Sequence, residues 1–189
     1  IKLSAMERKE SHRAATRGRA NQGWLDTRHT FSFANYYDPE RVHCGMLRVL
    51  NDDIVAPGGG FGTRPHDNME IVSVPLEGAL EHRDSMGNIA VIREGEIQVM
   101  SAGTGIMHSE YNQNNDRLVK FLQIWVFPEK QDIKPHYDQI SYDKTKMKNT
   151  LLEIVSPCPS DKGSACINQQ AWSFLGDLDQ GKAVEYTLH

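Results

Sequence analysis

The amino-acid sequence predicts an all-β protein folded as a barrel or a sandwich. From Trp24 onward the chain contains short runs rich in β-branched and aromatic residues, and clusters of glycine, proline, asparagine and aspartate separate these runs. Short strands joined by such turns at this spacing are typical of barrels and sandwiches. No run approaches the roughly 20 apolar residues of a membrane-spanning helix, so we expect no membrane association.

The predicted strands follow one another in five segments. They are residues 45–50, 69–76, 88–92, 96–100 and 118–127. Turn clusters such as APGGG, DSMGN and SAGTG lie between them and supply the glycine and asparagine residues that tight turns require. The last segment, LVKFLQIWVF, barely alternates between apolar and polar residues, so we expect a strand that is buried on both faces.

The chain divides into four predicted parts. Residues 1–20 carry six Lys and Arg against two Glu, which indicates a basic N-terminal arm in the form of a solvated tail or an edge strand. Residues 21–127 form the barrel, and residues 128–150 are read as a linker. Residues 151–189 are too few for an independent barrel, so we expect them to pack as partial strands against the first barrel, a partner chain or a continuation of the chain.

Charge and cysteine usage indicate the cellular setting. A formal net charge of -4 gives no reason to expect nucleic acid as a partner. The N-terminal residues lack the apolar core of a signal peptide. The three cysteines, Cys44, Cys158 and Cys166, contain no C-x-x-C pair, which fits a reducing cytosol. We therefore expect a cytoplasmic protein.

Three familiar chemistries are excluded by missing motif partners. The glycines at 58–62 are followed by no G-K-[ST], so they do not form a phosphate-binding loop of the P-loop type. The sequence His108-Ser109-Glu110 has the H-x-E form of a zinc deaminase, but the required P-C-x-x-C is absent. No G-x-S-x-G elbow of a serine hydrolase is present.

A candidate metal site is split between two predicted strands. Arg64 and His66 lie two positions apart, as do His108 and Glu110, and residues two apart in a strand point to the same face. If the two segments are neighbours inside a barrel, these four side chains converge. Two imidazoles and one carboxylate are the ligand set of a non-haem iron site with open positions.

The two segments resemble the two cupin motifs, and longer strings resemble the pirin family. The strings are GWLDTRHTFSFANYYDPE, LRVLNDDIVAPGGGFGT, LEGALEHRDSMGN and SAGTGIMHSEYN. The similarity runs from about Gly18 to Tyr137 and continues more faintly beyond. It implies a bicupin with a jelly-roll β-barrel at the N-terminus and a second barrel that is incomplete in this chain, with 151–189 as its beginning.

The resemblance also implies a ligand set and an activity. Three histidines and one glutamate bind the metal in this family, usually iron as Fe(2+), and they correspond to position 64, His66, His108 and Glu110. Bacterial members are associated with quercetin 2,3-dioxygenase activity on a flavonol, and Glu110 would act as the proton acceptor. Nuclear members are associated with transcriptional cofactor roles, so a protein partner stays open. Glu70 is expected to support the ligands from behind or to have a structural role, and His82 to support the ligands or to stabilise a turn.

Arg64 departs from the family pattern, because a guanidinium cannot become a metal ligand. We expect Arg64 to reach Glu110 and form a charge-assisted pair in the space that a cation would occupy. The alternative is that Arg64 turns out to solvent and leaves His66, His108 and Glu110 free to hold iron with weaker affinity. Three functions follow as alternatives: an iron-dependent dioxygenase that uses His66, His108 and Glu110, a metal-poor binding or regulatory protein, and a structural domain with a vestigial cavity.

Overall fold

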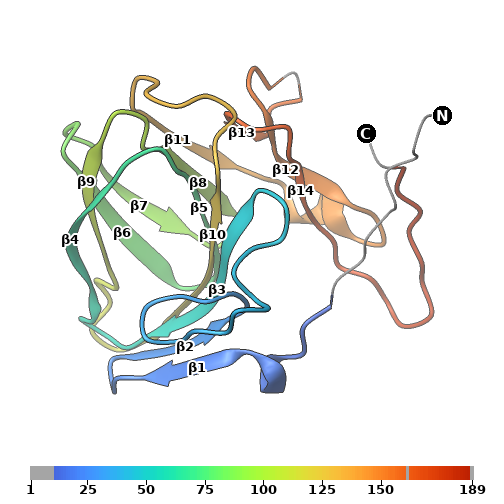
Figure 1. Cartoon of the computed structure of the whole chain (residues 1–189). Coiled ribbons are helices and arrows are strands. Elements are labelled where there is room, and N and C mark those ends of the chain that lie inside the picture. Colours follow the sequence, from blue (N-terminus) through green and yellow to red (C-terminus); the bar gives the residue numbers. More distant parts are fainter. Residues whose placement is uncertain (1–10, 161, 188–189) are drawn as a thin grey trace.

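The computed structural model describes residues 11–160 and 162–187, and in this part of the chain the all-β prediction is confirmed. Two sheets face each other (Figure 1). The first has the strand order β1 (Gly18–Asn21), β2 (Leu25–His29), β3 (Leu47–Val55), β10 (Val119–Val126), β5 (Glu70–Glu77), β8 (Glu96–Ser101) and β11 (His136–Ser141). The second has the order β4 (Gly60–His66), β9 (Ile106–Tyr111), β6 (Ala79–Asp84) and β7 (Ile89–Arg93).

The apolar core at one end of the barrel joins the two sheets. Phe121 of β10 is fully buried and packs with residues from both sheets, including Leu80 of β6 and Val55 of β3. Burying side chains of this size stabilises the fold by about 1.5–3 kcal/mol each. A second cluster around Met100 and Ile106 lies nearer the other end. The space between these two clusters is left to polar side chains.

The strand β10 is covered on both faces, as its sequence predicts. It pairs with β3 on one side and with β5 on the other. Phe121 and Gln123 are buried on the inner face, whereas Leu122 and Ile124 pack against a cluster on the outer face. A strand between two packed layers needs no polar face, and this explains the weak alternation of its sequence.

The C-terminal segment packs on the outer face of the first sheet, which is the first of the three arrangements expected for it. It forms a small sheet in the order β13 (Ala165–Ile167), β12 (Leu152–Pro157) and β14 (Ser173–Leu175), on the side of the barrel away from β4 and β9 (Figure 1). Ile154 and Val155 are buried against Val72 and Val99 of the barrel. Ile154 and Val155 are therefore shielded from solvent by the first sheet, and they shield its outer face in turn.

A disulfide joins Cys158 and Cys166, whose Cα atoms are 4.9 Å apart. The cysteines are eight residues apart in sequence, but the parallel pairing of β12 with β13 brings them together. Nothing in the sequence marked this pair, because the two cysteines form no C-x-x-C motif. Among the described residues, no helix is long and apolar enough to cross a membrane.

The flanking segments differ in part from their expected form. Residues 128–150 were expected as a linker, but 136–141 form β11, which pairs along its length with β8 and extends the first sheet. The 3-10 helix η2 (Lys144–Met147) follows β11. Of the expected N-terminal arm, residues 1–10 lie outside the described residues. The rest contains the 3-10 helix η1 (Ala14–Thr16) and the edge strand β1, which pairs with β2.

Candidate metal centre and cavity

The candidate site is built on β9, which lies between β4 and β6 in the second sheet. The pairing register places Arg64 of β4 opposite His108, and His82 of β6 opposite Glu110. Met107 is exposed, whereas its neighbour His108 is buried. The expected two-residue alternation therefore turns His108 and Glu110 into the barrel together.

A glycine at the start of β4 allows the two strands to lie this close. A Cβ atom added at Gly60 would lie 2.3 Å from the ring of Tyr111 and 2.5 Å from the backbone oxygen of Glu110. Any side chain at this position would push β4 away from β9. The GGGFG stretch thus serves strand packing in the barrel wall.

Glu110 is fully buried and accepts three hydrogen bonds. The Arg64 guanidinium and the Gln123 amide both donate to Oε2, each at 2.9 Å, and the Ser73 hydroxyl donates to Oε1 at 3.1 Å. Burial opposes ionisation of Glu110, but the charge of Arg64 and the bond from Gln123 help to hold its pKa below the ordinary value. Glu110 is therefore a carboxylate at neutral pH.

Arg64 forms the expected ion pair with Glu110. Its guanidinium also lies over the ring of Phe61, 4.8 Å from the centroid, in a cation–π contact. The contact with Glu110 uses one nitrogen, Nη2, and the other, Nη1, is buried without a hydrogen-bond partner. The positive charge of Arg64 therefore balances part of the negative charge of the buried Glu110 carboxylate.

His66 and His108 are neutral, and ring nitrogens of both lack hydrogen-bond partners. The centroids of the two rings are 4.8 Å apart. Burial, reinforced by the charge of Arg64, lowers the pKa of His66 to about 4. Burial is also the main cause that lowers the pKa of His108 to about 3. His66 Nε2 and both ring nitrogens of His108 are buried without hydrogen-bond partners.

These observations fit a bound metal ion. A neutral imidazole offers one nitrogen lone pair, and buried polar atoms normally have partners in a folded protein. Three buried side chains, those of His82, His108 and Glu110, have potential ligand atoms within 4.8 Å of one another. The sequence also predicted His66 as a ligand. Its ring contacts that of His108, but among the described residues His66 is not part of this group of three.

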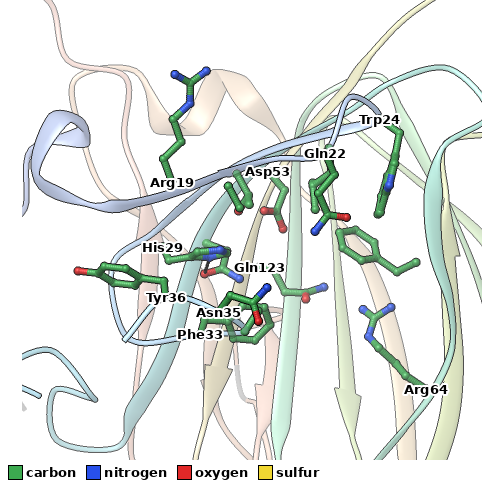
Figure 2. A pocket seen from close by; sticks show the side chains of 16 residues that line it. Arg19, Gln22, Trp24, His29, Phe33, Asn35, Tyr36, Asp53, Arg64 and Gln123 are labelled. Atoms are coloured by element: carbon green, nitrogen blue, oxygen red, sulfur yellow. Dashed lines mark hydrogen bonds between the residues drawn. The ribbon is translucent and has the colours of Figure 1, made fainter. Parts of the chain in front are cut away.

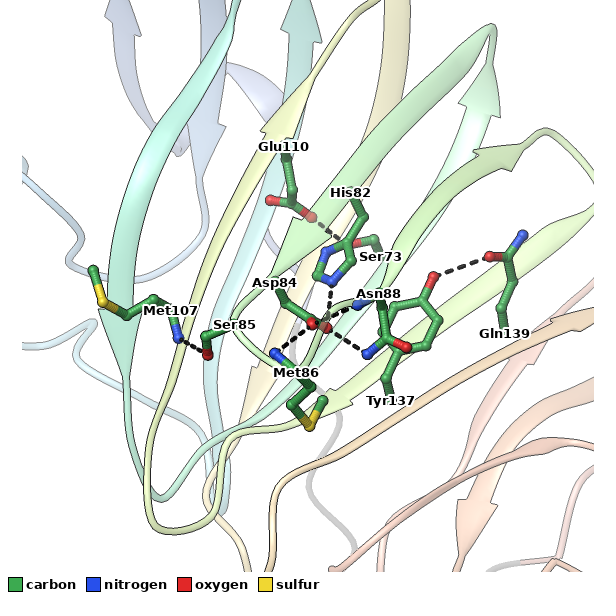
Figure 3. Close-up of polar contacts among 10 residues, drawn as sticks. All are labelled: Ser73, His82, Asp84, Ser85, Met86, Asn88, Met107, Glu110, Tyr137 and Gln139. Carbon is green, nitrogen blue, oxygen red and sulfur yellow. Dashed lines mark hydrogen bonds and ion pairs between the residues drawn. The ribbon is translucent and has the colours of Figure 1, made fainter.

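His82 is held by a carboxylate behind it. Its Nε2 lies 3.0 Å from Asp84 Oδ2, and both side chains are fully buried (Figure 3). Asp84 also accepts bonds from the side chain of Asn88 and from the backbone of Met86 and Asn88. Burial opposes its ionisation, but the bonds from His82 and Asn88 hold the pKa of Asp84 below the ordinary value.

Glu70 faces away from the site, so of its two expected roles the structural one agrees with its contacts and support of the ligands does not. Its carboxylate accepts a bond from the Ser101 hydroxyl at 2.7 Å and from the backbone N–H of Asn168 at 3.1 Å. Alternation along β5 explains the difference, because Ser73 faces Glu110 whereas Glu70 and Val72 face the C-terminal segment. Glu70 therefore anchors the C-terminal segment to the barrel.

A cavity of about 450 Å³ opens beside the metal-ligand cluster. Its wall combines the rings of Trp24, Phe33, Tyr36 and Phe61 with polar side chains, and Figure 2 shows Trp24 and Arg64 on one side and Tyr36 on the other. Arg64 and Gln123 line it, and both hydrogen-bond to Glu110, so they connect the cavity to the cluster. Asp53 also lines the cavity, and burial raises its pKa to about 7.

Sequence analysis missed two groups that hold Glu110. Gln123 is a lone amide within the apolar run LVKFLQIWVF, and Ser73 is a lone hydroxyl within MEIVSVPL. A single polar residue inside a doubly buried strand was the available signal, because burying an unpaired amide or hydroxyl is costly. Asp84 was also missed, and its place in a turn cluster gave no sign of a contact with His82.

Taken together, the fold and site define a cupin-type barrel with a buried histidine and glutamate cluster next to an aromatic cavity. Residues 10–126 match the family model described as Pirin. The chain belongs to the pirin family.

Relatives extend this similarity over most of the chain. The quercetin 2,3-dioxygenase of Escherichia coli strain K12 is 48% identical over 169 residues, which cover 87% of this chain and 71% of that protein. The crystal structure of YhhW from Escherichia coli is 47% identical, with a TM-score of 0.81 over 86% of this chain and 68% of that chain. A structure of bacterial pirin YhhW in complex with nickel(II) has a TM-score of 0.78 and 47% identity, and the match covers 83% of this chain and 66% of that chain.

Proposed function

We propose that this chain is a metal-dependent dioxygenase that acts on a flavonol such as quercetin. The observation that carries the proposal is the set of buried imidazole nitrogens without partners beside Glu110, at the edge of an aromatic cavity. The names of its relatives support the substrate class, and the nickel(II) complex of the related pirin supports a divalent metal. We propose Fe(2+) or another divalent transition metal as the cofactor.

The ligands proposed from the sequence are His66, His108 and Glu110. A divalent metal bound there would supply Lewis acidity toward a hydroxyl oxygen of the substrate. The neutral imidazoles need lose no proton to bind it. Glu110, as an ionised carboxylate, would accept the proton of the substrate hydroxyl if it leaves the metal.

The cavity supplies binding and orientation. Trp24, Phe33, Tyr36 and Phe61 offer flat apolar surfaces to a planar ring system. Arg64 and Gln123 are hydrogen-bond donors beside the cluster and can orient the oxygen atoms of the substrate. Aromatic walls with a few convergent polar groups are typical of a small-molecule site.

The ion pair of Arg64 with Glu110 favours a second function, that of a metal-poor binding or regulatory protein. A fixed positive charge near the cluster repels a divalent ion, and it already balances the carboxylate. In this alternative the cavity keeps its ability to bind an aromatic molecule, and the redox chemistry is lost.

One comparison tests both functions. The unmodified chain and the Arg64→His variant are purified without chelators, and bound metals are quantified by elemental analysis. Flavonol turnover is followed as oxygen uptake and loss of flavonol absorbance. Near-stoichiometric metal with turnover in the unmodified chain supports the dioxygenase. Metal and turnover only in the variant support the binding protein, and absence of metal from both contradicts the metal centre.

A further inference from the structure

We propose that His82 is a metal ligand in this chain, so that the metal centre consists of His82, His108 and Glu110 and lies toward β6 rather than β4. This inference rests on the proposed metal-dependent function and specifies which residues hold the metal. It reassigns His82, which the sequence suggested only as a support for other ligands.

The strand register carries the first step. β9 has β4 on one side and β6 on the other, and His82 lies directly opposite Glu110 across β6 and β9. Side chains opposite each other in an antiparallel pair project on the same face with their Cβ atoms about 4.5–5.5 Å apart. A donor missing from β4, where Arg64 stands, can therefore be replaced from the other flank of β9.

The second step is the state of the His82 ring. Nε2 lies 3.0 Å from Asp84 Oδ2, a carboxylate oxygen that can only accept. In the neutral ring, Nε2 then carries the proton and Nδ1 the lone pair. Nδ1 is buried and has no hydrogen-bond partner. A metal-binding histidine usually donates the N–H of one ring nitrogen to a carboxylate and binds the metal through the other nitrogen.

The spacing of the three residues is the third step. The potential ligand atoms of His82, His108 and Glu110 lie within 4.8 Å of one another. Nitrogen ligands about 2.1 Å from a tetrahedral ion are about 3.4 Å apart. The three side chains would therefore need only a short inward movement to hold an ion, and no strand would need to shift.

The side of Glu110 that faces Arg64 is the less favourable place for a cation. Arg64 donates to Oε2, and its charge repels a divalent ion more strongly at shorter distances. His66 is on β4 with Arg64, two residues away. A position toward β6 keeps the carboxylate and His108 within reach and places the ion farther from the guanidinium.

The test measures metal affinity rather than activity. Cobalt(II) is titrated into the metal-free 189-residue chain and into three variants, His82→Ala, His66→Ala and Asp84→Asn. Binding is followed by calorimetry and by the visible absorption of the cobalt ion, which depends on its ligands. His136→Ala serves as the control because His136 is exposed on β11. Thermal unfolding of each metal-free variant checks that it is folded.

We expect His82→Ala to weaken cobalt binding by at least tenfold and to change the cobalt spectrum, whereas His66→Ala has a smaller effect than His82→Ala. Asp84→Asn should weaken binding by about 10- to 100-fold, because the asparagine amide donates to Nε2 and moves the ring proton onto Nδ1. His136→Ala should bind as the unmodified chain does.

Two outcomes contradict the inference in distinguishable ways. If cobalt binds with the same affinity and spectrum in His82→Ala but is lost in His66→Ala, the inference is wrong and the proposed metal-dependent function stands. If the unmodified chain binds no cobalt, the metal-dependent function itself fails, and the ligand assignment fails with it.

Discussion

Glu70 and Glu110 are both fully buried carboxylates, yet the regions around them differ in how their polar groups are satisfied. On the outer face of the first sheet, Glu70 bonds to Ser101 and Asn168 and fastens the C-terminal segment to the barrel. On the inner face, Glu110 is also well bonded, but the imidazoles beside it have buried nitrogens without partners.

The difference indicates which region is structural and which is functional. A buried polar atom without a partner costs about 1–3 kcal/mol, and such atoms persist mainly where a function requires them. The outer face combines satisfied polar groups with a continuous apolar cluster. The inner face holds the unpartnered nitrogens of His66, His82 and His108 next to a cavity.

The strongest test of this contrast is a cavity in the outer cluster. Ile154 is almost fully buried between the C-terminal segment and the barrel. Ile154→Ala should lower the free energy of unfolding by about 3 kcal/mol, measured by urea denaturation. Cobalt affinity of the folded variant should stay within twofold of the unmodified chain. A large loss of affinity would show that the two regions are coupled.

Burial of an acidic group on the inner face should make the free energy of unfolding depend on pH. The folded pKa of Asp53 is about 7, above the ordinary 3.8, because the carboxyl is buried. Its favourable contribution to stability is complete below about pH 4 and is lost as the pH rises through 7. Asparagine mimics the protonated acid, so Asp53→Asn should raise the free energy of unfolding by a few kcal/mol at pH 8 and change it little at pH 4.

A neighbour in the same strand provides the control for this pH effect. Asp52 has a side chain that is 41% exposed, so Asp52→Asn should change stability by less than about 0.5 kcal/mol at either pH. Equal effects of the two substitutions would contradict the claim that ionisation of the buried Asp53 destabilises the folded protein. Urea denaturation at both pH values measures each difference.

The smallest expected effect compares the two faces of one strand. Glu70→Gln should lower the free energy of unfolding by about 1 kcal/mol, because it weakens charge-assisted bonds to Ser101 and Asn168. Cobalt affinity should not change. Ser73→Ala, on the opposite face of β5, removes a bond to Glu110 and should instead alter cobalt affinity. The reverse pattern would invalidate the division into two regions.

Much of the fold followed from local sequence patterns. The doubly buried strand at 118–127 and the convergence of the 64/66 and 108/110 pairs required only side-chain alternation and turn positions. The strand at 136–141 was missed because HYDQIS is mostly polar, and its strand conformation depends on pairing with β8. The face on which Glu70 lies was also mispredicted, since MEIVSV is buried on both sides and its pattern marks neither face.

The sequence by itself determined the all-β class, the family resemblance, the four residues at the candidate site and the contact of Arg64 with Glu110, because each depends on residue type and on spacing within one or two strands. Only the tertiary structure decided that His82, bonded to Asp84, lies opposite Glu110, that Ser73 and Gln123 hold Glu110, and that Cys158 meets Cys166. These contacts depend on the register between strands and on which layer covers a face, and neither is encoded in the pattern of a single segment.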